Sequence, residues 1–185
     1  MITNPQELEA TLSGPIPPGR LARVYGQDIA RHGLWADALR LAAAGTAKGP
    51  AAHLAFHAGW ALEFAYFADP AGFAPYTAQF LEDFPTVQNP SVHRHYTKIL
   101  CDLLRRGAVQ PTPAQAEVIA ERCFDFLIDA TVKIGVKMWA MDVLEMLVPR
   151  VEWIGEHLRE VIEQQMEGGS PGMVSHGRKL LRRLK

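Results

Sequence analysis

The chain contains 185 residues, of which 48% are hydrophobic and 21% are charged, and its formal net charge is −1. This composition excludes a disordered chain, and the near-neutral charge gives the molecule no overall attraction for nucleic acids or anionic membranes. No uncharged apolar stretch is long enough to predict a membrane span, and residues 1–19 show no basic segment followed by an apolar run. We therefore expect a cytoplasmic protein.

The predicted elements are helices that follow an extended leader. Residues 1–19 contain four prolines and predict an extended segment, and residues 20–185 predict a single helical domain. Apolar residues recur every three or four positions, which is the period of an amphipathic helix, and no stretch alternates as a strand would. Helices or helical stripes are expected at 20–31, 33–44, 50–67, 72–84, 92–103, 116–127, 136–147, 150–167 and from 171 onward. The predicted class is all-α.

Prolines divide this helical region at nearly even steps, at Pro50, Pro70, Pro90, Pro113, Pro149 and Pro171. Several follow a residue that caps helices, as in Asn89-Pro90, Thr112-Pro113 and Ser170-Pro171, and Asp129 and Thr131 can cap at the step without a proline. Steps of about 20 residues predict helices paired into units of about 40, the period of HEAT and armadillo repeats. We therefore predict an α-α superhelix, a HEAT- or armadillo-like solenoid, of about four helical hairpins.

A short pattern of three apolar residues and an acid supports this repeat. It occurs in Trp60-Ala61-Leu62-Glu63, Ile99-Leu100-Cys101-Asp102 and Trp139-Ala140-Met141-Asp142. Equivalent positions stack in a solenoid, so Glu63, Asp102 and Asp142 are expected to form a row along one surface. The apolar residues are expected in the core, and Lys98 is expected to pair with Asp102 four positions later. On this basis Trp139→Ala would destabilise the protein by about 3–5 kcal/mol.

Three segments carry a resemblance to a known family: 89–95, 136–144 and 165–185. From about residue 50 to the end, the chain resembles small uncharacterised bacterial HEAT-like repeat proteins, some of which are labelled adenylosuccinate lyase. The resemblance implies a HEAT-like fold, and the label implies a lyase activity.

The label can be compared with the residues. The loop of such lyases carries glycine and two serines, followed by methionine, proline, lysine and asparagine; Gly169, Ser170 and Met173 correspond, but Pro171 replaces the second serine. The later proline and the lysine–asparagine pair are also missing, and Ser170-Pro171 is explained as a helix cap followed by the first helical residue.

No residue set predicts catalysis, a metal site or a cofactor. His53 and His57 have a spacing that can chelate a metal, but no third ligand lies nearby in the sequence. Cys101 and Cys123 lie on apolar stripes and are expected to be buried and reduced. The basic residues of the last helix are expected to cap the end of the solenoid, with a phosphate-binding edge as the alternative: Arg178, Lys179, Arg182, Arg183 and Lys185.

The leading functional hypothesis is a non-enzymatic interaction module. Its concave surface would bind a protein or peptide partner through Arg94, Lys98, Lys137, Glu63, Asp102 and Asp142. Charge reversal at Arg94 or Lys137 would then abolish binding. The oligomeric state is left open by the sequence.

The alternative hypothesis is a nucleic-acid-binding protein of the HEAT-like DNA glycosylase type. Aromatic residues and a carboxylate on the concave face would then grip damaged duplex, and Trp60, Trp139, Asp102 and Asp142 are residues of the required kinds. The net charge of −1 and a core position for the tryptophans argue against this alternative.

Overall fold

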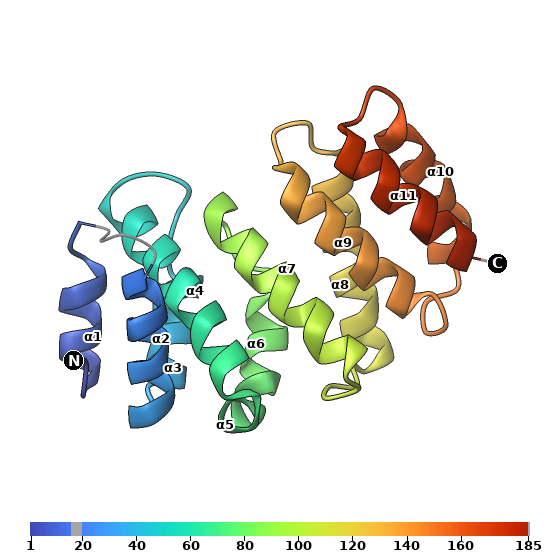
Figure 1. Cartoon of the computed structure of the whole chain (residues 1–185). Helices are drawn as coiled ribbons and strands as arrows, with labels where there is room; N and C mark the ends of the chain where they lie inside the picture. The colour runs from blue at the N-terminus through green and yellow to red at the C-terminus, as the bar shows by residue number, and fades with distance from the viewer. Residues whose placement is uncertain (16–19, 185) are drawn as a thin grey trace. The chain divides into compact units, whose positions relative to one another are not determined.

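The computed structural model describes residues 1–15 and 20–184, and this part of the chain contains helices and no strand (Figure 1). The all-α prediction is therefore confirmed. Contacts divide the chain into two compact units, which are Met1–Ile99 and Leu100–Lys185. The predicted HEAT-like superhelix and the single domain over 20–185 stay predictions.

Unit 1 begins with α1 and ends within α7. Its elements are α1 (Pro5–Leu12), α2 (Arg20–His32), α3 (Trp35–Ala43), α4 (Pro50–Ala68), α5 (Pro70–Phe73), the 3-10 turn η1 (Ala74–Tyr76), α6 (Thr77–Asp83) and the first part of α7 (Pro90–Arg105). The helix predicted at 72–84 is thus divided into three short pieces. Its aromatic residues nevertheless enter the core, since Phe73, Phe80 and Phe84 are buried.

The prediction of an extended leader is wrong for α1. Asn4 accepts a hydrogen bond from the backbone N–H of Glu7, and Pro5 occupies the first turn, where its missing N–H costs nothing. Leu8 and Leu12 are buried, and the backbone N–H of Ile2 donates to Asp28 at 2.7 Å. A capped start and a buried apolar stripe therefore make this segment a helix, while residues 16–19 of the leader lie outside the described residues.

Helix α4 lies between α2 and α7 in unit 1 (Figure 1). A Cβ atom on Gly26 of α2 would lie 2.7 Å from the backbone nitrogen of Ala65 and 2.7 Å from the Cβ atom of Phe64. On the other side, a Cβ atom on Gly59 would lie 3.3 Å from Val92 of α7. Glycine at these two positions lets both neighbours approach the backbone of α4 closely.

Unit 2 contains the end of α7 and four further helices: α8 (Pro113–Ile128), α9 (Ile134–Leu147), α10 (Ile154–Met166) and α11 (Pro171–Arg183). Two of the predicted caps are confirmed there. Thr112 forms a capping box with Gln115, and Ser170 accepts a hydrogen bond from the backbone N–H of Met173.

The predicted cap at Asp129 and Thr131 is wrong. Asp129 accepts hydrogen bonds from the backbone N–H and the hydroxyl of Thr131, which forms a local turn. Helix α9 begins only at Ile134, and no side chain caps its first turn. Within the described ranges, none of these helices combines the length and the apolarity that crossing a membrane requires.

The glycine contact between α2 and α4 gives the first prediction. We expect Gly26→Ala to destabilise the protein by about 1–3 kcal/mol, because the added methyl group meets backbone atoms that cannot move aside. Gly135→Ala is the matched control, since its Cβ atom meets nothing within 4 Å. Urea denaturation measures both, and equal stabilities for the two variants would contradict this account of the packing.

Candidate functional site

Helix α4 exposes a row of aromatic side chains, which we call the aromatic face: Phe56, Trp60, Phe64 and Phe67. These positions step by four, four and three, so they share one side of the helix. Leu62 on the opposite side is fully buried. Phe56, Trp60 and Phe64 are half-buried, and Phe67 is 38% exposed. An apolar row that is only partly buried within the described chain is a recognised mark of an interaction surface.

One flat face of each of these rings is already occupied. Phe56 and Trp60 stack on each other, with ring centroids 5.7 Å apart and an interplanar angle of 15°. The Arg23 guanidinium lies 5.8 Å from the centroid of Phe64, and Lys98 Nζ lies 4.7 Å from that of Phe67. The aromatic face therefore offers ring edges flanked by two cations, one from α2 and one from α7.

A buried carboxylate joins α4 to α7 beside the aromatic face. Glu63 is only 7% exposed, and its two carboxylate oxygens have separate partners. His95 Nδ1 donates to one oxygen at 2.6 Å, and Lys98 Nζ donates to the other at 2.5 Å. The two donors compensate the negative charge of Glu63, whose burial without partners would be unfavourable.

The pKa of Glu63 reflects this balance. Burial alone raises the pKa of its carboxyl group, but the hydrogen bonds from His95 and Lys98 and their charges outweigh burial, so the pKa lies below the ordinary value of 4.5. The carboxylate is therefore ionised at neutral pH, and its stabilising contribution is lost only as the pH falls below about 4.5.

A second buried acid occupies the corresponding repeat position in unit 2. Asp142 is 6% exposed, with His176 Nε2 at 3.1 Å in a contact that lacks hydrogen-bond geometry, Arg183 at 3.7 Å and Arg105 at 3.8 Å. Arg183 also forms a bidentate ion pair with Glu145, in which Nε and Nη2 donate to the two carboxylate oxygens at 2.5 and 2.7 Å. This cluster joins α7, α9 and α11, and its charges compensate one another.

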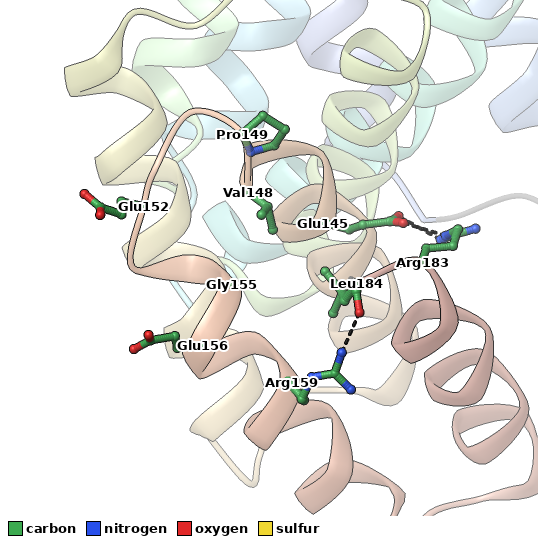
Figure 2. A pocket seen from close by; sticks show the side chains of 9 residues that line it. All are labelled: Glu145, Val148, Pro149, Glu152, Gly155, Glu156, Arg159, Arg183 and Leu184. Carbon is green, nitrogen blue, oxygen red and sulfur yellow. Dashed lines mark hydrogen bonds and ion pairs between the residues drawn. The ribbon is translucent and has the colours of Figure 1, made fainter.

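A pocket of about 610 Å³ lies next to this cluster, and Figure 2 shows its lining. Arg183 is held by Glu145, and Arg159 donates to the backbone carbonyl of Leu184 at 2.5 Å. The carboxylates of Glu152 and Glu156 point away from these groups (Figure 2). Arg159 and Arg183 thus already bind groups of the protein itself. This pocket is therefore a weaker candidate for a binding site than the aromatic face.

The remaining predicted site residues are Lys137, Asp102 and Arg94, and each has a different environment. Lys137 is 8% exposed, and its Nζ donates to the carbonyl of Leu127 near the end of α8 at 2.8 Å, so it does not line a surface. Asp102 pairs with Arg106 at 2.7 Å, and the predicted Lys98–Asp102 pair stays a prediction. Arg94 is exposed.

The three acids of the predicted row do not all lie in one unit. Glu63 lies in unit 1, whereas Asp102 and Asp142 lie in unit 2. The row itself therefore stays a prediction.

The core position predicted for the repeat tryptophans is wrong. Trp60 and Trp139 are half-buried, although their neighbours Ala61, Leu62, Ala140 and Met141 are fully buried. At Trp60 and Trp139 the side chain of the first residue of the pattern keeps contact with solvent, whereas Ile99, the first residue of the second pattern, is fully buried. The loss expected for Trp139→Ala falls below the range of about 3–5 kcal/mol that applies to a fully buried ring.

The sequence patterns missed Arg23, Phe56, Phe64 and Phe67. A signal was nevertheless present, because residues 50–68 are apolar on every side, and a helix of that kind is usually covered all round. The aromatic residues of this helix at steps of three and four, opposite its alanines and Leu62, could have identified the aromatic face.

The histidine pair and the cysteines do not form a reactive site. His57 Nδ1 donates to the carbonyl of Leu12 at 2.7 Å, and burial lowers the pKa of this histidine, while His53 is exposed. Both cysteines are free and buried as predicted, and burial raises the pKa of Cys101 to about 12. Across residues 1–15 and 20–184, no group of three or more histidine, cysteine, aspartate or glutamate side chains is arranged to hold a metal ion.

Comparisons of the chain with protein-family models, with curated proteins and with solved structures found no match.

The Glu63 cluster gives the second prediction. We expect Glu63→Gln to lower the free energy of unfolding by about 1.5–3 kcal/mol at pH 7, because His95 and Lys98 lose a charged acceptor. The difference from the unmodified protein should shrink as the pH falls below about 4.5, because the Glu63 carboxyl group of the unfolded chain binds a proton first and the native carboxylate, with its lowered pKa, binds one at lower pH. Urea denaturation at pH 7 and at about pH 3.5 measures this.

Glu9→Gln is the control for this prediction. Glu9 forms only an exposed contact with Arg40 at 3.5 Å, so the change should cost about 0–1 kcal/mol at either pH. A Glu63→Gln effect that did not depend on pH would contradict the assigned ionisation.

Proposed function

We propose that the protein is a non-enzymatic interaction module that binds a segment of a partner protein on the aromatic face of α4. The observation that carries the proposal is the row of Phe56, Trp60, Phe64 and Phe67, which is only partly buried: the first three are half-buried and Phe67 is exposed. Aromatic residues and arginine are enriched among the residues that contribute most to protein interfaces. The cations beside the row favour an acidic segment over a basic one.

The occupied ring faces favour a protein segment over a nucleic acid. Single-stranded nucleic acids bind by stacking bases on open aromatic faces. Here Phe56 and Trp60 cover each other, and Arg23 and Lys98 cover Phe64 and Phe67. Apolar peptide side chains can pack against ring edges, which remain accessible. The nucleic-acid alternative is therefore a contrary outcome of the test below.

We also propose that the helices form HEAT-like repeats in a cytoplasmic protein. Support comes from the apolar-triplet-and-acid pattern, which recurs in α4, α7 and α9, and from the proline at the start of α4, α7 and α8. Such repeats commonly present an extended binding surface. A lyase activity finds no support in Ser170, because its hydroxyl caps α11.

The third prediction tests the aromatic face directly. Peptides selected from a random library by the unmodified protein are resynthesised and titrated by fluorescence anisotropy. We expect Trp60→Ala to weaken their binding by about thirtyfold, which corresponds to a loss of about 2 kcal/mol at an interface hot spot.

Trp139→Ala is the matched control, because Trp139 is also half-buried and occupies the same position of the repeat pattern. It should change the affinity by less than about threefold, within the range of energetically neutral positions. Equal losses in both variants would contradict the assignment to α4. Tight binding of a single-stranded or duplex oligonucleotide at low salt, lost in Trp60→Ala, would replace the protein partner by a nucleic acid.

A further inference from the structure

A hollow of about 280 Å³ lies at the α2 side of the aromatic face. It is lined by Arg23 and Gln27 of α2 and by Phe64, Phe67 and Ala68 of α4. Pockets for drug-sized ligands usually measure about 300–1,000 Å³, so this hollow is sized for a single side chain or chain end rather than for a large cofactor.

Arg23 differs from Lys98 in its electrostatic partners among the described residues. No carboxylate among the described residues forms an ion pair with it, and its guanidinium lies 5.8 Å from the centroid of the Phe64 ring. Lys98 differs, because its charge is compensated by Glu63 at 2.5 Å. A guanidinium that rests on a ring keeps its planar edge of N–H donors free for a carboxylate.

Gln27 adds a second polar group at the required position. It follows Arg23 by four residues, so the two side chains lie one turn apart on the same side of α2. Its amide N–H₂ can donate to the same carboxylate that Arg23 binds. No acidic side chain lines the hollow, and its apolar lining comes from Phe64, Phe67 and Ala68.

We propose that this hollow is a carboxylate-binding site for a residue that joins a carboxylate to an apolar group. Arg23 and Gln27 hold the carboxylate, and the apolar part packs on Phe64 and Phe67. The carboxylate comes either from an aspartate or glutamate side chain or from the C-terminus of the docked segment. The inference rests on the proposed function and names the chemistry that the partner segment must carry.

Three small probes test the site and separate the two sources of carboxylate. N-acetyl-phenylalanine carries a terminal carboxylate, N-acetyl-aspartyl-phenylalanine amide carries a side-chain carboxylate, and N-acetyl-phenylalanine amide carries none. Each is titrated into the full chain while the side-chain N–H signals of Arg23, Gln27 and Trp60 are followed by NMR. We expect at least one carboxylate probe to shift the Arg23 and Gln27 signals with a Kd at least tenfold below that of the neutral amide.

The stronger of the two carboxylate probes identifies the source. Equal Kd values for the neutral amide and for both carboxylate probes would overturn the proposal, and so would the absence of any shift at Arg23.

Substitutions on α2 provide the matched controls. Arg23→Gln should abolish the difference between carboxylate and amide, and Arg23→Lys should keep only part of it, because lysine lacks the planar pair of donors. Arg31→Gln removes the same charge from an exposed position of the same helix and should leave binding unchanged. Equal effects of Arg23→Gln and Arg31→Gln would overturn the proposal, since only the general charge would then matter.

The outcomes separate this inference from the proposed function. If the affinity of the probes does not depend on Arg23 while Trp60→Ala still weakens the binding of the selected peptides, only the carboxylate site is wrong. If the probes depend on Arg23 while the selected peptides do not depend on Trp60, the carboxylate site stands and the aromatic face is not the partner's docking surface.

Discussion

The close approach of α2 and α7 to α4 is the constraint on which the rest of unit 1 depends. Gly26 and Gly59 permit that approach, because a Cβ atom at Gly26 would meet a backbone atom of α4 at 2.7 Å and one at Gly59 would already be in tight contact with Val92 of α7 at 3.3 Å. Both neighbours therefore cover the flanks of α4 and contribute little to its outer side. A helix that is apolar on every side is then left with an aromatic row that is only partly buried.

Electrostatics divides the cations near that row into two kinds. Glu63 engages His95 and Lys98, which fixes α7 against α4 and compensates the charge of Lys98. Arg23 on the other side has a ring beneath it and no carboxylate partner among the described residues. Lys98 thus stabilises the contact between α4 and α7, whereas Arg23 keeps its donors for a ligand. This difference is the basis of the proposed ligand chemistry.

Individual residues show why sequence patterns succeeded and failed here. Caps such as Thr112 and Ser170 were predictable, because a cap depends on residues three positions apart. Asn4-Pro5 follows the same rule, but the four prolines of residues 1–19 favour an extended segment and hide the start of α1. The bonds of Lys98 to Glu63 and of Lys137 to the carbonyl of Leu127 were not predictable, since the pairing of a long side chain depends on which helix lies beside it, and local spacing cannot report that.

The sequence by itself determined the helical class, the starts of most helices and the buried residues of each apolar triplet. These properties follow from local capping chemistry and from the 3.6-residue period, both of which act within a few turns. Only the tertiary structure decided that Glu63 is an internal anchor, that the tryptophans reach solvent, and that the face of α4 beside Arg23 stays open. Those outcomes depend on which helices cover which sides, and that is set by contacts between residues more than 30 positions apart, such as Glu63 and His95.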